Sequence, residues 1–317
     1  MRIISALTIA VLAASCIKSI PEVSSGRIER LENFRSAYVD PRNVDIWLPE
    51  DYDPSMKYAV LYMHDGQMLF DSTKTWNGQE WKVDEAISEL ISSGKIVPCI
   101  VVGIWNNGDY RHTEYFPEKA LEGLDADERS NIVTNFLKEK PLADEYLKFL
   151  TEELKPYIDS HYSTLTDREN TIIMGSSMGG LISLYAICEY PEIFGGAGCL
   201  STHWPMISPD SSSMATEIPV VAGMRRYLSE NLPDPEEHRI WFDYGTATLD
   251  SFYEPHQMLV DEIMAGKGYG PENWMTRKFE GADHSEKSWS ARLDIPLTFL
   301  LGKPDNQPDQ DYKPQEA

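Results

Sequence analysis

Positive charge is scarce in this sequence. Its 317 residues include 28 Lys and Arg against 51 Asp and Glu, so the formal net charge is -23 at pH 7. Proteins bind nucleic acids through basic surfaces that neutralise phosphates, and this charge balance therefore argues against a nucleic-acid partner. It also disfavours anionic small ligands unless a local basic pocket receives them.

Cysteine is equally scarce, with four residues in the whole chain. One of them, Cys16, ends a predicted leader, which leaves Cys99, Cys188 and Cys199 for a mature exported protein. An odd number of cysteines cannot pair completely, so at least one thiol is free. All three lie in apolar stretches, and we expect buried structural cysteines. A Cys188–Cys199 disulfide is the alternative.

The apolar segment at the N-terminus is short. Residues 1–16 read MRIISALTIAVLAASC, one Arg followed by about a dozen apolar or small residues, which is too short to span a bilayer and typical of a secretory signal. Small residues directly before Cys16 resemble a bacterial lipobox, in which the cysteine becomes the lipidated N-terminus. We therefore expect an exported protein, either periplasmic or attached to the outer membrane or cell surface through lipidated Cys16. An ordinary signal peptide with a chance cysteine is the alternative, and residues 17–28 are predicted to be a polar tether.

The rest of the sequence alternates between strand and helix patterns. We predict strands at residues 35–40, 43–53, 57–67, 95–107, 169–175, 194–201, 239–245 and 273–281. We predict helices at residues 80–93, 143–158, 177–188, 256–267 and 286–301. This alternation predicts an α/β fold with a mostly parallel central sheet and helices on both faces.

The predicted helices and strands form one domain over residues 29–302. Two irregular segments, residues 116–142 and 202–237, follow strand ends, where insertions often shape a pocket. The tail at residues 303–317 is polar and is expected to be disordered.

One short stretch carries a catalytic motif. Residues 171–186 read TIIMGSSMGGLISLYA, in which Gly175-Ser176-Ser177-Met178-Gly179 fits the pattern G-x-S-x-G with Ser177 at its centre. In a strand–turn–helix context, this pattern strains the serine backbone and exposes the hydroxyl. The N–H of Met178 would then lie at the helix N-terminus, where it can stabilise an oxyanion.

A serine hydroxyl needs a base to become a nucleophile, and the base needs an orienting acid. His284 follows the last predicted strand, which is where this fold places the base. The other downstream histidines fit this place less well, namely His203, His238 and His256. The acid should follow the strand at 239–245, and Asp250 is the natural candidate. Asp243, inside that strand, and Glu254 are the alternatives.

Further positions are candidates for binding substrate. Gly66 allows a tight turn at the end of the strand predicted at 57–67, and we expect the N–H of Gln67 to be the second oxyanion donor. Aromatic, amide and guanidinium side chains after two strand ends suit sugar or aryl esters. These candidates are Trp105, Asn106, Arg111, Tyr115 and Trp204. Alternatively, Arg111 pairs with Glu114 to brace the loop and the tryptophans belong to the core.

Taken together, these stretches resemble a known family. VLYMHDGQMLFD (60–71), GSSMGGLISLYA (175–186), GTATLDSFYEP (245–255) and GADHSEKSW (281–289) are similar to the esterase family of α/β hydrolases, in particular to its bacterial HDGQ members. That family includes enterochelin esterases, S-formylglutathione hydrolase, antigen 85 mycolyltransferases, and feruloyl and acetyl-xylan esterases. The resemblance covers roughly residues 30–301. It implies the α/β-hydrolase fold, a triad of Ser177, Asp250 and His284, and no metal or organic cofactor.

The expected function is therefore a serine esterase. An exported location and an aromatic pocket favour acetyl or feruloyl groups on carbohydrate as substrates. A siderophore ester and acyl transfer to an alcohol are the alternatives, together with a non-catalytic surface binding protein on a hydrolase scaffold. The carboxylates show no His or Cys spacing for a transition metal, and no metal site is expected.

Overall fold

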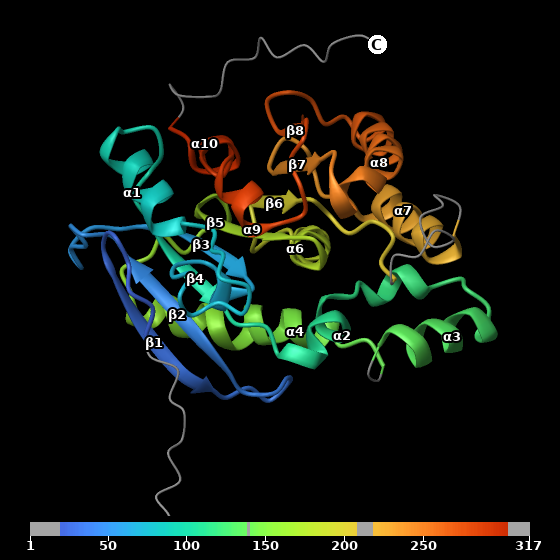
Figure 1. The fold of residues 1–317 in the computed structure, drawn as a ribbon, viewed down its shortest axis with the longest axis horizontal. Helices are drawn as coiled ribbons and strands as arrows, with labels where there is room; N and C mark the ends of the chain where they lie inside the picture. The colour runs from blue at the N-terminus through green and yellow to red at the C-terminus, as the bar shows by residue number, and fades with distance from the viewer. Residues whose placement is uncertain (1–19, 138–139, 208–217, 304–317) are drawn as a thin grey trace, which may run out of the picture.

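The central strands consist almost entirely of apolar and small residues. Four of them are buried at every position, namely β3 (Ala59–His64), β4 (Cys99–Ile104), β5 (Thr171–Ser176) and β6 (Gly196–Leu200). Strands buried on both faces need helices on both sides, and the computed structural model has this arrangement (Figure 1). The structure describes residues 20–137, 140–207 and 218–303.

The strands form one eight-stranded sheet in the order β1-β2-β4-β3-β5-β6-β7-β8. The outer strands are β1 (Arg27–Phe34), β2 (Arg42–Leu48), β7 (Arg239–Gly245) and β8 (Trp274–Phe279). Only the β1–β2 and β2–β4 pairs are antiparallel, and all others are parallel. The carboxyl ends of six parallel strands therefore meet at one edge of the sheet.

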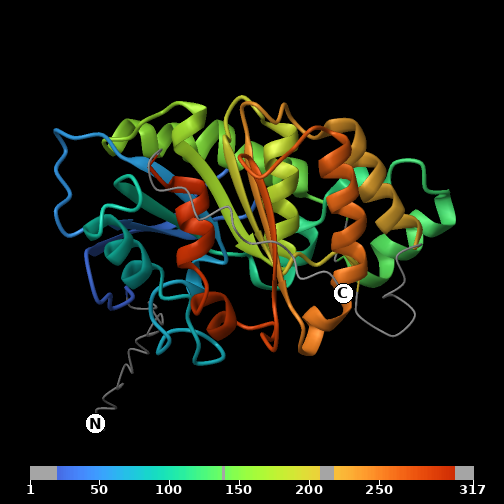
Figure 2. The same ribbon diagram turned by 90° about the horizontal axis from the view of Figure 1, so that it is seen from above.

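Helices cover both faces of the sheet (Figure 2). One face packs against α1 (Val83–Ser92), α9 (Glu286–Ser290) and α10 (Asp294–Leu301). The other face packs against a longer set of helices. These are α4 (Ala143–Lys148), α5 (Lys155–His161), α6 (Met178–Glu189), α7 (Pro219–Asn231) and α8 (Glu254–Gly266). The fold is the α/β arrangement that the alternating pattern predicts.

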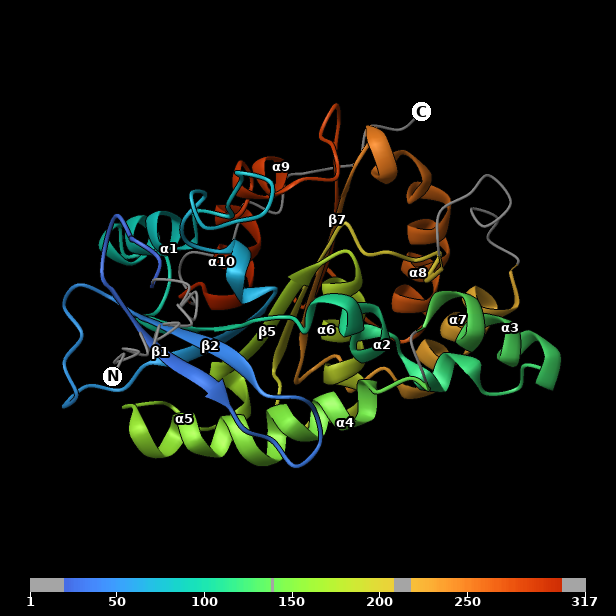
Figure 3. The ribbon, with the colours of Figure 1, turned by 60° about the horizontal axis from the view of Figure 1, so that its bottom comes forward.

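The first strand lies earlier in the chain than predicted. Residues 35–40 form bends and irregular backbone, and β1 pairs antiparallel with β2 instead. The predicted tether at residues 17–28 therefore overlaps the fold, because Arg27 and Ile28 belong to β1. The sequence did not reveal this strand, because β1 is a half-exposed edge strand that carries four charged residues. It lies beside α4–α5, where Phe34 packs against Phe149 (Figure 3).

Two predicted helices differ from the structure. The segment at 143–158 is one continuous helical stretch, but residues Phe149–Leu154 adopt a π-helix between α4 and α5. The segment at 286–301 divides into α9 and α10. Pro296 explains the break, because proline lacks an N–H and fits only the first turn of a helix.

The two irregular segments contain helices of their own. Residues 116–142 include a 3₁₀ turn, η3 (Glu118–Leu121), and α3 (Ala126–Phe136), whose N-terminus carries a capping box formed by Asp125 and Glu128. Residues 202–237 include α7, preceded by residues that lie outside the described part of the chain. α7 packs against η3, so both insertions lie on the same side of the molecule.

The described cysteines are free and buried, so the Cys188–Cys199 disulfide is not formed. The predicted signal at residues 1–16, with Cys16, lies outside the described residues, as does the tail from residue 304. Within the described ranges, no helix is long and apolar enough to cross a bilayer. The same ranges contain no group of three or more potential metal-ligating side chains.

Candidate active site

Ser177 occupies the turn between β5 and α6. Its φ of 58° and ψ of −121° are values that non-glycine residues rarely adopt. Its N–H donates to the Leu200 carbonyl oxygen at 2.9 Å, which ties the turn to β6. A Cβ on Gly175 would lie 2.9 Å from the Gly179 carbonyl carbon, so the close approach of strand and helix requires glycine there. The motif thus forms the strained junction that its pattern predicts.

Asp250 and His284 come together at the carboxyl edge of the sheet. Asp250 is 0% exposed and lies in a 3₁₀ turn, η6 (Thr248–Phe252), which follows β7. His284 follows β8, and its Nδ1 lies 2.5 Å from Asp250 Oδ1. Because an ionised carboxylate only accepts, Nδ1 carries the proton and Nε2 keeps a lone pair. His284 and Ser177 line the same cavity.

The two alternative acids are bound elsewhere. The Asp243 carboxylate is buried against Arg292, at 2.7 Å, and accepts from the Trp241 indole at 2.8 Å. Glu254 accepts from Lys278 at 3.1 Å. Neither carboxylate contacts His284 among the contacts of the described residues. The structure therefore brings Asp250, and not Asp243 or Glu254, to the histidine.

The remaining downstream histidines have structural partners. His238 contacts the carbonyl oxygens of Asp234 and Pro191. His256 is 1% exposed, because it lies on the buried face of α8 with Gln257, Val260 and Met264. His203 lies 2.8 Å from the Tyr253 hydroxyl and 3.0 Å from the Ile207 carbonyl oxygen, and burial lowers its pKa to about 4.

Of the two predicted oxyanion donors, Met178 directly follows Ser177 and Gln67 lines a cavity that Ser177 also lines. Met178 is the first residue of α6, so its N–H has no acceptor within the helix. Gln67 lies in a 3₁₀ turn, η1 (Gly66–Met68), which follows β3 and lines the cavity. A Cβ on Gly66 would lie 2.4 Å from the Gly103 carbonyl carbon, so glycine permits the tight approach of this turn to β4. The turn and the helix N-terminus border the same space.

The larger cavity at Ser177 has a volume of about 840 Å³. Of the predicted substrate-binding residues, Asn106 and Arg111 line it. Arg111 forms a two-pronged ion pair with Asp65, with both contacts at 2.7 Å. Although burial opposes ionisation, Arg111 lowers the pKa of Asp65. Glu114 pairs with Arg42 at 2.6 Å, so the alternative Arg111–Glu114 brace is not formed.

Three predicted binding residues do not line the two cavities at Ser177. Tyr115 is 0% exposed and packs against His64 and Tyr146. Trp204 is 3% exposed and donates its indole N–H to Gln257 at 2.9 Å. Trp105 is half-buried and donates its indole N–H to Asp45 at 2.9 Å. Tyr115 and Trp204 belong to the packing of the domain, and a role of Trp105, Tyr115 and Trp204 in binding substrate stays a prediction.

His64 is the last residue of β3, just before the η1 turn, and its contacts are those of a structural residue. Burial lowers its pKa to about 3, so the ring is neutral, and its Nδ1 lies 2.9 Å from the Tyr146 hydroxyl. The ring is 2% exposed, and His64 is not among the described residues that line the two cavities at Ser177.

One exposed aromatic residue in the larger cavity was missed. Trp76 is 85% exposed and lines the cavity together with Lys74, Asn77 and Gln79. Its loop is fixed to the residues after His284, because Asn77 donates to Glu286 at 2.8 Å. The available signal was a lone tryptophan in the polar stretch DSTKTWNGQE. Composition alone could not place that loop at the cavity.

A second, smaller cavity of about 340 Å³ lies on the other side of Ser177. Its described lining is mostly apolar and includes Phe136 from α3, Met178, Ile207 and Leu249. The insertion at residues 116–142 therefore contributes to the wall of the site. Ser177 is shared by the two cavities, so an ester bound at its hydroxyl can extend into both.

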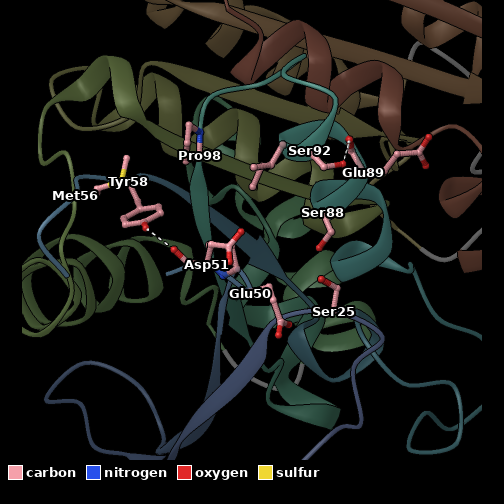
Figure 4. Close-up of a pocket in the computed structure, with 11 residues that line it drawn as sticks. Ser25, Glu50, Asp51, Met56, Tyr58, Ser88, Glu89, Ser92 and Pro98 are labelled. Atoms are coloured by element: carbon pink, nitrogen blue, oxygen red, sulfur yellow. Dashed lines mark hydrogen bonds between the residues drawn. The ribbon is translucent and has the colours of Figure 1, made fainter. Parts of the chain in front are cut away.

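Another cavity, of about 570 Å³, lies at the opposite edge of the sheet (Figure 4). Tyr58 and Pro98 line it, and they directly precede β3 and β4. None of its lining residues in the described part of the chain is a histidine or a cysteine. It therefore offers no nucleophile and base of the kind found at Ser177.

The fold and the site define an α/β hydrolase that acts on carboxylic esters. The family model described as "Putative esterase" matches residues 36–297, and the chain belongs to this family. The chain is 23% identical over 264 residues to YbbA, an uncharacterized protein of Bacillus subtilis, covering 83% of this chain and 93% of YbbA.

Two further similarities are to proteins of named activity. The chain is 28% identical over 185 residues, 57% of its length, to an endo-1,4-β-xylanase/feruloyl esterase of Xylanibacter ruminicola. The match covers 22% of that longer protein. The solved structure of the enterobactin esterase of Shigella flexneri superposes with a TM-score of 0.60 at 18% identity, covering 88% of this chain and 60% of that one.

Proposed function

We propose that the protein is a serine esterase with Ser177 as nucleophile, His284 as base and Asp250 as orienting acid. The observation that carries this proposal is the 2.5 Å contact between Asp250 Oδ1 and His284 Nδ1. That contact leaves the second imidazole nitrogen for the cavity that Ser177 also lines. The strained backbone of Ser177 supports the same role, because such strain is found where a side chain must be presented to a substrate.

The reaction has two halves. In the first, Ser177 Oγ attacks the ester carbonyl carbon while His284 Nε2 takes the hydroxyl proton. The N–H groups of Met178 and Gln67 hold the resulting oxyanion, and His284 returns the proton to the departing alcohol. In the second half, His284 deprotonates water, which attacks the acyl-enzyme and releases the carboxylic acid. Asp250 stays ionised and stabilises the imidazolium formed in both halves.

We further propose that the substrates carry acetyl or feruloyl groups on carbohydrate. The larger cavity supports a saccharide alcohol, because Trp76 offers an exposed aromatic face beside amide side chains such as Asn77 and Gln79. The smaller cavity has a mostly apolar lining that includes Phe136 and Leu249, and it suits the acyl group. A relative named as a xylanase and feruloyl esterase supports this choice.

A siderophore ester is the second candidate, supported by the likeness to an enterobactin esterase. Such ligands are strongly anionic. The cavity carries Lys74 and Arg111 against Asp65 and Glu286, and Arg111 is already paired with Asp65. This balance provides no excess positive charge, and the carbohydrate ester is favoured.

The protein is also proposed to be exported and anchored through Cys16. This proposal rests on the apolar segment and the small residues that precede the cysteine.

The activity is tested in two assays. Purified protein should hydrolyse p-nitrophenyl acetate, and a fluorophosphonate probe should label Ser177, whereas Ser177→Ala should do neither. A release assay with acetylated xylan, feruloylated oligosaccharide and a ferric siderophore ester then identifies the substrate class. Absence of turnover together with absence of labelling would support a non-catalytic binding protein instead.

A further inference from the structure

A network of buried, hydrogen-bonded polar side chains lies behind the Asp250–His284 pair. At its centre is Ser201, the residue after β6, which is 0% exposed. Its hydroxyl oxygen lies 2.5 Å from Asp250 Oδ2, 2.9 Å from Trp289 Nε1 and 3.1 Å from Arg292 Nη2. None of these contacts is needed to form a triad of Ser177, His284 and Asp250, so the network at Ser201 must have another role.

The donors fix the direction of every hydrogen bond at Ser201. An indole N–H and a guanidinium can only donate, so Trp289 and Arg292 occupy the two lone pairs of the Ser201 oxygen. The Ser201 proton is then directed to Asp250 Oδ2. The N–H of Gly245 donates to the same carboxylate oxygen at 2.6 Å. Asp250 Oδ2 therefore receives two protein donors, and Oδ1 is left to accept from His284.

Arg292 is itself held in place behind Ser201. Its Nη2 and Nε lie 2.7 and 3.2 Å from Asp243 Oδ1, and the Trp241 indole donates to Asp243 Oδ2. Arg292 and Asp243 are both buried. A guanidinium that donates to Ser201 polarises its O–H bond and strengthens the bond that Ser201 gives to Asp250. Hydrogen bonds thus link Asp243, Arg292, Ser201, Asp250 and His284 in that order.

The backbone of Ser201 has an unusual conformation. Its φ is 42°, a left-handed value that glycine adopts far more easily than serine. Its N–H donates to the Asp243 carbonyl oxygen at 2.8 Å, which fixes the residue between β6 and β7. The sequence therefore places a hydroxyl side chain at a position where the backbone conformation alone would favour glycine.

We propose that Ser201, held by Arg292, is a positioning residue of the esterase that fixes Asp250 and withdraws negative charge from its carboxylate. This inference rests on the proposed function. Without the Ser201 donor, the carboxylate concentrates its charge on the side of His284 and stabilises the imidazolium. The base then stays protonated to higher pH, so the acidic limb of the pH–rate profile moves upward.

Other charged and titratable groups surround this pair and must stay unchanged in the test. Behind Asp250 are Asp243 and Arg292. Tyr253, directly after η6, and His203, in the loop after β6, face the pair. Arg111 and Glu286 line the cavity with His284.

The test uses Ser201→Gly and Ser201→Ala in the full chain. Glycine suits the positive φ, so Ser201→Gly removes the hydroxyl without adding backbone strain. We expect kcat for p-nitrophenyl acetate to fall about tenfold or more, with KM changed less than about twofold. The acidic limb of kcat/KM should move up by about half a pH unit or more. Arg292→Lys should shift the limb in the same direction.

Thr171→Ala is the matched control, because it removes another buried hydroxyl, whose acceptor is the Asp167 carbonyl oxygen at the far end of β5. It should leave kcat and the pH profile unchanged. A folded Ser201→Gly with wild-type kcat and pH profile overturns the proposal. A lower kcat with no movement of the acidic limb also overturns it, because that result indicates a purely structural role. Failure of the wild-type protein to turn over esters refutes the proposed function instead.

Discussion

At the scale of single residues, two buried aspartates belong to the hydrogen-bonded network that ends at His284, and their contacts separate their roles. Asp250 contacts His284, whereas Asp243 neutralises Arg292. Asp250→Asn should lower kcat by about three to four orders of magnitude, because the amide cannot hold the required imidazole tautomer.

Asp243→Asn should act mainly on stability. It removes the charge that compensates buried Arg292, which should lower the free energy of unfolding by a few kcal/mol, about 3 to 5. Its kcat per folded molecule should fall far less than that of Asp250→Asn. Steady-state kinetics and urea unfolding measure the two effects. The reverse ranking of kcat, with both variants folded, would exchange the roles assigned to the two aspartates.

Trp76 tests the carbohydrate side of the proposal. Because its ring is 85% exposed, Trp76→Ala should leave stability unchanged. It should raise KM for a feruloylated oligosaccharide about fivefold through lost stacking, and leave p-nitrophenyl acetate kinetics unchanged. Met258→Ala, which removes an exposed side chain from α8, is the control. An equal effect of Trp76→Ala on both substrates would argue against a sugar-binding role.

The sequence could identify residues whose position follows from chain order. The motif and the order of strands placed Ser177, Asp250 and His284 after the ends of three parallel strands, and the structure brings Asp250 and His284 into contact. The sequence could not identify which aromatic residues face the cavity. Trp204 and Trp76 both follow strands in polar stretches, but one is buried and the other exposed. Loop conformation decides that difference, and no periodicity encodes it.

At the scale of secondary-structure elements, periodicity predicted what packing depends on most. The apolar strands β3 to β6 were found because a strand buried on both faces is almost continuously apolar. β1 was missed because an edge strand needs only one apolar face, and its charged residues resemble a tether. The π-helical stretch in α4–α5 was missed because a one-residue change in hydrogen-bond spacing leaves the apolar pattern nearly intact.

The contact between η3 and α4 predicts a pH-dependent stability. Burial and a hydrogen bond with the Asp144 carboxyl raise the pKa of Glu118 to about 8. The folded state therefore holds a proton that the unfolded chain releases near pH 4.5, so the stability contributed by this contact falls as pH rises from about 4.5 to about 8.

Glu118→Gln removes this dependence because the amide stays neutral. The variant should unfold about 2 to 4 °C above wild type at pH 8.5 and at the same temperature as wild type at pH 4.5. Thermal unfolding followed by circular dichroism at both pH values measures this difference. Glu122→Gln, in which the exposed residue after η3 is changed, should show no such pH dependence. A stabilisation of Glu118→Gln that is equal at both pH values would contradict the assigned cause.

At the scale of the whole molecule, the net charge of -23 bears on how the protein stays at a membrane. Anionic lipid surfaces attract basic segments and repel acidic ones, so the domain has no electrostatic reason to remain bound. We therefore expect any attachment to come from a lipid on Cys16. The reach of such an anchor is short, because the Glu22 N–H donates to Asp71 at 3.0 Å and only five residues lie between Cys16 and Glu22.

An extended chain of this length spans at most about 20 Å, so a lipid on Cys16 would hold the domain close to the bilayer. The loop that follows Asp71 and carries Trp76 would lie near the point of attachment. Cys16→Ser should therefore move the protein from the membrane fraction to the soluble periplasmic fraction of a bacterial host. Its kcat for p-nitrophenyl acetate should not change. Phase separation in detergent and activity measurements on both fractions test this. A Cys16→Ser protein that stays with the membrane at low salt would show that another segment anchors the chain.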